Sequence, residues 1–405
     1  MPGSAFHPAA LYAADLFSAG DVDAVRAVLD GMIESAVAWA HAVLPEQAAW
    51  AAILLRRTLE YLMGPVRDLG GRFHWLALVA ALILAGWVFA FRAAPSAVPL
   101  GEAAPARGLR GFLRYCFPRR IWLSRSTWVD LQVGFINHVY AYAASNVFWR
   151  VTGAAVAAWI TTWLTATFGP SPIGAEWGLG ALLAFTVLMS MASDFGYFLF
   201  HWASHRIGPL WEIHKLHHSA EVLSPLTAAR VHPFERLAMG PIRAVITGLV
   251  LAPAIYLYAG EATVLTILGL DAMAVLFNML GHVLHHSHVW VYYGPVVGRV
   301  IVSPAQHQIH HSALPQHLDR NFAEHWAFWD WIFGTLYLPK GRETLTFGLA
   351  GVATQPHGNV AAAYLRPVLG AGRSACTLAW RLAARAVPRR QPGAAQAPVP
   401  EPPRR

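Results

Sequence analysis

Long runs of apolar residues, separated by short polar segments, make up most of the chain from residue 74 onward. The first run, at 74–91, has close to the roughly 20 residues that an α-helix needs to cross about 30 Å of hydrocarbon. Further apolar stretches cover 178–200, 237–258 and 262–284. We expect the last two, which a short turn joins, to form a helical hairpin. The segment 128–168 is apolar with scattered polar side chains, and it predicts an interfacial helix followed by one span.

The two ends of the chain have different patterns. Residues 1–72 interleave acidic residues and arginines with apolar residues at helical spacing, which predicts amphipathic helices without a cleaved signal peptide. The end of the chain is rich in Pro, Ala, Gln and Arg, and we expect it to be disordered. The predicted organisation is an N-terminal helical region (1–72), a first transmembrane helix with its linker (73–110), a membrane catalytic domain (111–340), a C-terminal extension (341–387) and a disordered tail (388–405).

Composition places these helices in a membrane. Hydrophobic residues make up 56% of the 405 residues and charged residues only 13%, whereas soluble domains carry about 25% charged residues. The chain has a net charge of +8. In a membrane protein an excess of basic residues usually lies in cytoplasmic loops, so we expect no nucleic-acid partner. Six arginines between 107 and 125 form the densest basic segment and are predicted to be cytoplasmic. The predicted fold is an all-α, multi-pass integral membrane bundle with a cytoplasmic, histidine-rich, metal-binding cap.

The histidines carry the candidate chemistry. Fifteen of the 20 histidines lie between residues 201 and 325, and their spacing recurs. One pair is four residues apart, a HxxHH pattern follows it, a second pair four residues apart comes later, and the HxxHH pattern then repeats. Helical residues three or four apart share one face, so their imidazoles can reach one metal. The candidate ligands are His201, His205, His214, His217, His218, His282, His286, His307, His310 and His311.

Ten imidazoles exceed what one metal ion can take. Crowded imidazoles disfavour the charged form, and the neutral form is the one that binds metal. A dinuclear site with four or five nitrogen ligands for each ion accounts for the number. No cysteine lies near these groups, which argues against structural zinc, but imidazole suits Fe, Cu and Zn alike. The order of the predicted spans allows all ten to meet at the cytoplasmic face. We expect His285 and His288 to lie beside the site.

Three segments together resemble one family. They are DFGYFLFHWASH at 194–205, WEIHKLHHS at 211–219, and HQIHH at 307–311 followed by WDWIFGT at 329–335. These motifs resemble the fatty acid hydroxylase superfamily, which includes sterol desaturases, sphingolipid hydroxylases and alkylglycerol monooxygenase. The resemblance covers about residues 115–340. The first 110 residues match no known pattern.

The resemblance implies an integral membrane, non-haem diiron oxygenase that activates O2 and hydroxylates or desaturates a lipid. By position, eight of the histidines match the three histidine boxes of the family, and His286 matches a histidine that precedes the last box. His282 matches less well, because some members have an amide there. His232 resembles part of an HPxE element. The implied cofactors are two Fe2+ ions, with electrons from an external electron-donor protein or a reduced pterin.

Several carboxylates lie close enough in sequence to orient the ligand imidazoles through their Nδ1–H groups. They are Asp194, Glu212, Glu235, Asp319 and Asp330. The expected substrate is a lipid, because a site at the end of spanning helices is reached most easily from within the membrane. The Arg- and Ala-rich, Lys-poor composition favours a bacterial inner membrane, with the active site facing the cytoplasm.

Other classes of protein explain the histidines less completely. A membrane haem protein for electron transfer explains two or four histidines, and a zinc-dependent membrane hydrolase or a metal transporter also uses such ligands. A hydrolase is expected to show an HExxH helix, which the sequence lacks. A tether that acts through the basic C-terminal tail leaves the histidines without a role.

Overall fold

A computed structural model describes residues 20–43, 49–67, 74–92, 107–148, 152–170, 178–258, 264–267, 270–352 and 355–386. Within these ranges the protein is helical, apart from one hairpin of two-residue strands, so the all-α prediction is confirmed. The α-helices are α1 (Gly20–Val43), α2 (Ala49–Arg67), α3 (Trp75–Arg92), α4 (Leu109–Cys116), α5 (Arg119–Trp122), α6 (Arg125–Phe148), α7 (Gly153–Phe168), α8 (Leu179–Arg206), α9 (Gly208–His218), α10 (Pro233–Leu257), α11 (Ala272–Met279), α12 (Gly294–Val297), α13 (Pro304–His310), α14 (Phe328–Ile332) and α15 (Val360–Ala386).

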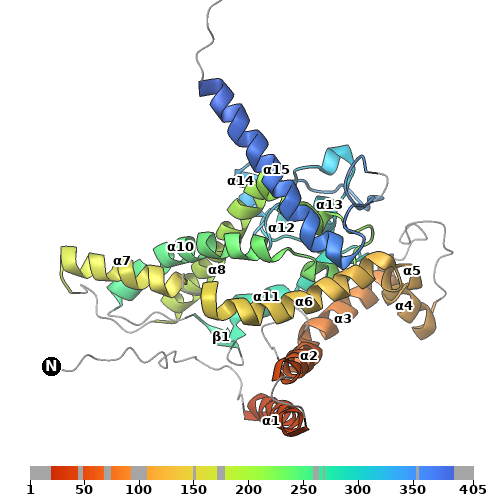
Figure 1. The fold of residues 1–405 in the computed structure, drawn as a ribbon, viewed down its shortest axis with the longest axis horizontal. Helices are drawn as coiled ribbons and strands as arrows, with labels where there is room; N and C mark the ends of the chain where they lie inside the picture. The colour runs from red at the N-terminus through yellow and green to blue at the C-terminus, as the bar shows by residue number, and fades with distance from the viewer. Residues whose placement is uncertain are drawn as a thin grey trace, which may run out of the picture.

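The longest apolar helices pack side by side at one end of the molecule. Helix α10 packs against both α7 and α8 (Figure 1). Two of the described helices, α8 and α10, are long and apolar enough to cross a membrane, and α3 and α7 are shorter apolar helices. Only 33% of the most apolar stretch of α8 and 17% of that of α10 is buried inside the protein. Exposed apolar helices of this length are typical of a membrane protein rather than of a soluble core.

The predicted helix over 262–284 is wrong. The described part of this segment contains an antiparallel hairpin of β1 (Thr266–Ile267) and β2 (Leu270–Asp271), followed by the short helix α11. The Asp271 side chain accepts hydrogen bonds from two backbone N–H groups of α11, so it caps the helix and fixes its start. Gly281, with φ 88°, then turns the chain out of the helix. The predicted hairpin of two long helices is therefore absent from the described residues.

The histidine-bearing elements form a cap beside this helical end. Helix α9 packs against α8 and α15, and α13 packs against η4 (His282–His286), a 3₁₀ helix. The other 3₁₀ helices are η3 (Pro225–Ala229) and η5 (Pro315–His317). The Arg230 side chain, which is 1% exposed, links several segments of the cap. Its guanidinium forms a 2.9 Å ion pair with Asp130 of α6 and donates to backbone carbonyls of Leu216 and His357.

Several predictions concern residues that the structure does not describe. The expected tail (388–405), the short turn at 259–261 and most of the linker after the first span lie outside the described residues. The same holds for residues 1–19, 44–48 and 68–73 of the N-terminal region. Its described part forms α1 and α2, which pack against each other around Ile33, Val37, Ala40 and Ala52. This described part is helical, as the spacing predicts.

Candidate metal centre

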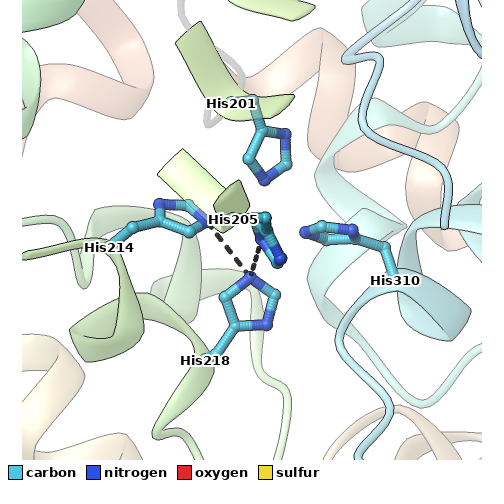
Figure 2. Close-up of side chains that lie close together, drawn as sticks. All are labelled: His201, His205, His214, His218 and His310. Carbon is cyan, nitrogen blue, oxygen red and sulfur yellow. Dashed lines mark hydrogen bonds between the residues drawn. The ribbon is translucent and has the colours of Figure 1, made fainter. Parts of the chain in front are cut away.

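Five histidines from three helices form the first group. Their ligand nitrogens all lie within 4.8 Å of one another. His201 and His205 come from the last two turns of α8, His214 and His218 from α9, and His310 from the end of α13. Figure 2 shows the five rings turned toward a common centre. The Nε2 atom of His218 lies 3.2 Å from that of His205 and 3.1 Å from that of His214.

The outer nitrogens of these rings fix which atom faces the centre. The Nδ1 atoms of His201 and His310 lie 2.6 and 2.8 Å from the backbone carbonyls of Phe322 and Arg320. Those of His205 and His214 lie 3.3 and 2.9 Å from carboxylate oxygens. An oxygen acceptor places the proton on Nδ1, so the Nε2 lone pairs converge on the centre. Lone pairs that face each other at about 3 Å repel one another unless a cation lies between them, so this group fits a metal ion.

Four histidines form the second group, with ligand nitrogens again within 4.8 Å of one another. His286 of η4 is at its centre. Its Nε2 atom lies 3.2 Å from that of His217, 3.1 Å from that of His311 and 3.0 Å from that of His307. All four side chains are buried. The two groups are adjacent, because the rings of His218 and His311, one from each group, stack with centroids 4.6 Å apart.

Each HxxHH segment contributes to both groups. On α9, His214 and His218 are four residues apart and belong to the first group, while His217, turned by about 100° from His218, belongs to the second. In the other segment His310 belongs to the first group, and His307 and His311 to the second. The spacing predicts that the three histidines of a segment share one face. The structure instead assigns them to two neighbouring centres.

His282 lies outside both groups. The prediction paired it with His286 on one helical face, but residues 282–286 form a 3₁₀ helix with about three residues per turn. Residues four apart then diverge, whereas residues three apart align, and the rings of His282 and His285 are 4.8 Å apart. The ligand atom of His282 lies with those of Glu324 and His325 in a third cluster. The structure therefore brings nine of the ten predicted ligands into the two groups.

Burial favours the neutral form of five grouped imidazoles outside α8. Burial, reinforced by the neighbouring His214 imidazole, lowers the pKa of His217 to about 3. Burial also lowers the pKa of His310 to about 3. The pKa values of His218, His307 and His311 are lowered well below the usual range by burial and by neighbouring imidazoles. Neutral imidazole is the form that binds a metal ion.

Two of the five predicted carboxylates contact a grouped histidine directly. Glu235, at the start of α10, lies 2.9 Å from His214, and Asp319 lies 3.3 Å from His205. Asp194 instead accepts backbone N–H bonds from His325 and Trp326. Glu212 pairs with Lys215 at 2.5 Å. The structure thus gives the role of orienting an imidazole to Glu235 and Asp319.

Asp330 acts on the site through the backbone. Its carboxylate accepts hydrogen bonds from the N–H groups of Phe322 and Ala323 and from the Thr335 hydroxyl. These bonds hold the segment whose Phe322 carbonyl faces His201. Sequence reasoning missed the two carbonyls that orient His201 and His310, because any residue type supplies a carbonyl. Asp319 and Asn321 adopt left-handed conformations, φ 58° and 56°, which Asp and Asn tolerate better than most residues, so these residue types were the local signal in the sequence.

Two other histidines that were expected near the site have structural contacts. His232 caps the N-terminus of α10, and its Nε2 atom lies 3.2 Å from the Tyr364 carbonyl. His288 lies 2.6 Å from the Tyr115 carbonyl. His285, by contrast, stacks on His307 with ring centroids 5.1 Å apart. Only His285 of these three lies against the candidate centre.

Cavities reach the centre from two sides. One of about 540 Å³ is bordered by His217, His286 and His307 of the second group and by residues of α8 and α10. Another of about 370 Å³ is bordered by His205, His218 and His310, together with Asp319. The first cavity adjoins the apolar helices α8 and α10.

Replacing Glu235 by glutamine is expected to weaken metal binding 10- to 100-fold, because a neutral amide holds the Nδ1 proton of His214 less strongly than a carboxylate. The measurement is the dissociation constant for Fe2+ of the purified variant. Glu212→Gln is the matched control, since Glu212 is on the same helix as His214 but pairs with Lys215. Equal Fe2+ affinities of the two variants would show that Glu235 does not support metal binding.

Comparison with known proteins agrees with this geometry. Residues 186–335, which include all ten candidate histidines, match the family model for fatty acid hydroxylase. Over these residues the chain is similar to the fatty acid hydroxylase superfamily. The predicted resemblance is therefore confirmed for this hydroxylase domain. No solved structure gives a significant match.

Curated relatives of the hydroxylase domain are alkylglycerol monooxygenases. The chain is 26% identical to that of Danio rerio over 162 residues, which are 40% of this chain and 32% of the relative. It is 28% identical to that of Homo sapiens over 156 residues, 38% of this chain and 31% of the relative. The matched region thus spans about a third of the length of these relatives. The family and these relatives support a lipid-modifying oxygenase.

Proposed function

We propose that the protein is a membrane-bound, non-haem diiron oxygenase that uses O2 to hydroxylate or desaturate a C–H bond of a membrane lipid. The observation that carries the proposal is the pair of adjacent groups, of five and four histidines, inside a hydroxylase domain. A haem needs at most two axial ligands, and a structural zinc needs four. Nine converging imidazoles fit two metal ions, each with an all-nitrogen ligand set.

The first group and the second group would each hold one iron, and the pair would supply O2 reduction and C–H oxidation. For hydroxylation, one oxygen atom enters the lipid and the other leaves as water, with two electrons and two protons taken up. We propose that an external electron-donor protein or a reduced pterin supplies the electrons. The residues of the chain orient the ligands: Glu235, Asp319 and two backbone carbonyls hold the Nδ1 protons.

The lipid is proposed to enter from the membrane. Helix α8 has 28 residues, about 42 Å at 1.5 Å per residue, which exceeds about 30 Å of hydrocarbon. Its last turns, with His201 and His205, would extend beyond the hydrocarbon. We propose a multi-pass protein of a bacterial inner membrane with this end in the cytoplasm. The cavity of about 540 Å³ beside α10 would then receive the substrate.

Metal analysis of the detergent-purified protein tests the proposal. We expect about two irons per chain, a Mössbauer spectrum of non-haem iron, and no Soret band. Lipids from expressing cells grown under ¹⁸O2 should carry one heavy oxygen if the reaction is hydroxylation, and a new double bond without the label if it is desaturation. One zinc per chain or a haem spectrum would overturn the diiron proposal, and would favour a zinc-dependent hydrolase or a haem electron-transfer protein respectively.

A further inference from the structure

The cavity beside α10 has two chemically different ends. At one end lie His217, His286 and His307 of the second group. Further along α10 the lining includes small or apolar residues and two arginines, Arg236 and Arg243. The two arginines are seven residues apart, so they lie on one face of α10, two turns from each other. Both therefore reach the same cavity as the histidines.

Arg243 is a permanent cation in an unusual place. It belongs to one of the two described helices that are apolar enough to cross a membrane. Charged side chains in such helices face a cavity or a partner, and they commonly mark the path of a substrate. The guanidinium of Arg243 donates a 2.5 Å hydrogen bond to the hydroxyl of Ser193 on α8. A hydroxyl satisfies one donor but does not neutralise the charge.

Close helix packing holds this arginine in position. A Cβ atom added at Gly196 of α8 would lie 2.9 Å from the Cα atom of Arg243. The absence of a side chain at Gly196 therefore lets α8 and α10 approach closely at this point. The backbone of Arg243 is fixed against α8, and the Ser193 contact lies one turn before Gly196 on the same helix. The cation is positioned rather than free to move into solvent.

The carboxylates that border the cavity are engaged elsewhere. Glu235 lies 2.9 Å from His214, and Glu324 lies 3.5 Å from His282, so both face histidines. Among the ion pairs between described residues, none includes Arg243. The cavity therefore has negative groups beside the histidines and an uncompensated positive group further along α10. An anionic group of a bound molecule would complement that charge.

We infer that the substrate is an anionic amphiphile whose carboxylate or phosphate group binds Arg243, with its C–H bond to be oxidised beside the second group of histidines. This inference rests on the proposed function, because the bound molecule is a substrate only if the protein is an oxygenase. Binding of the anionic group to Arg243 does not itself require turnover. Arg236 lies about 10 Å nearer the start of α10, at 1.5 Å per residue. Arg236 also lines the cavity.

Binding of three lipids that share one dibrominated stearoyl chain tests the inference. They are the free fatty acid, the lysophosphatidic acid and the neutral monoacylglycerol, and quenching of tryptophan fluorescence of the purified full chain at pH 8.5 reports binding. We expect the dissociation constant of at least one anionic lipid to be ten-fold or more below that of the monoacylglycerol. Which anion binds more tightly distinguishes a carboxylate from a phosphate group.

Variants show whether Arg243 is responsible. Arg243→Gln is expected to remove the preference and leave binding of the monoacylglycerol unchanged, while Arg243→Lys retains part of the preference. Arg299→Gln is the matched control, because the exposed Arg299 side chain donates to the Pro295 carbonyl and does not line the cavity. Equal binding of all three lipids by the unmodified protein, or a preference that survives in Arg243→Gln, would overturn the inference.

The two proposals fail in different experiments. Iron content of Arg243→Gln should equal that of the unmodified protein, because Arg243 contacts no grouped histidine, and this also shows that the variant folds. An anionic preference without iron would overturn the diiron proposal alone. Two irons per chain without an anionic preference would overturn the binding inference alone.

Discussion

His218→Ala is expected to abolish lipid oxygenation and to lower the iron content of the purified protein. The Nε2 atom of His218 lies within 3.2 Å of the Nε2 atoms of both His205 and His214, so its removal opens the first group at its centre. Loss of a residue that only orients a ligand typically costs 10- to 100-fold. Loss of a ligand itself should therefore lower the product yield by at least about 100-fold.

Product yield in membranes and iron per purified chain are the two measurements. His288→Gln is a suitable control, because His288 is a buried histidine of the same domain that contacts the Tyr115 carbonyl rather than the two groups. It should retain iron and activity. Full iron content with full activity in His218→Ala would show that the first group is not part of the catalytic site.

The metal-free protein is expected to lose stability steeply as the pH falls from 7.5 to 5. In the folded state the pKa values of His217 and His310 are about 3, against 6.5 in the unfolded chain. Between these values the unfolded state binds protons that the folded state excludes, so acid favours unfolding. The cost is on the order of 2 kcal/mol for each such imidazole at pH 5.

Outside α8, burial lowers the pKa of five grouped imidazoles. They are His217, His218, His307, His310 and His311. His217 and His310 alone should lower the free energy of unfolding by roughly 4 kcal/mol at pH 5, a large part of the stability of a domain, and the other three act in the same direction. Asp330 opposes them, because burial raises its pKa to about 6 and its folded form gains a proton as the pH falls. One carboxyl offsets only about 1–2 kcal/mol.

Denaturant unfolding in detergent, followed by circular dichroism between pH 7.5 and 5, measures this dependence. His310→Asn should show a shallower slope, because one titrating group is removed. Bound metal should oppose unfolding near pH 7 and dissociate in acid, which steepens the curve of the metal-loaded protein. A free energy of unfolding that stays constant over this range would contradict the burial of neutral imidazoles.

Much of the domain could be predicted from local patterns. The apolar run at 74–91 corresponds to α3, and those at 178–200 and 237–258 correspond to α8 and α10. Apolar length and helical spacing carry this information along the chain itself. The clustering of most of the predicted histidines was similarly accessible, because four-residue spacing on a regular helix keeps two imidazoles together, as it does for His214 and His218.

The remaining features depend on backbone geometry that spacing does not encode. His282 and His286 have the same four-residue spacing, but the 3₁₀ geometry of η4 separates them. The carbonyls of Phe322 and Arg320 contact His201 and His310 only because Asp330 and Asn321 hold a distant loop in place. Apolar length alone does not reveal the hairpin before α11 or the cap at Asp271 that starts this helix.

The alternation of histidines along α9 limits how the chain can change in length. Inserting or deleting one residue between His214 and His217 would rotate the following side chains by about 100°. His217 and His218 would then both leave their groups, so a single event would damage both centres. The exposed turn at Gly341 carries no grouped histidine. Length variation among homologous hydroxylase domains should therefore accumulate in such turns and spare α9.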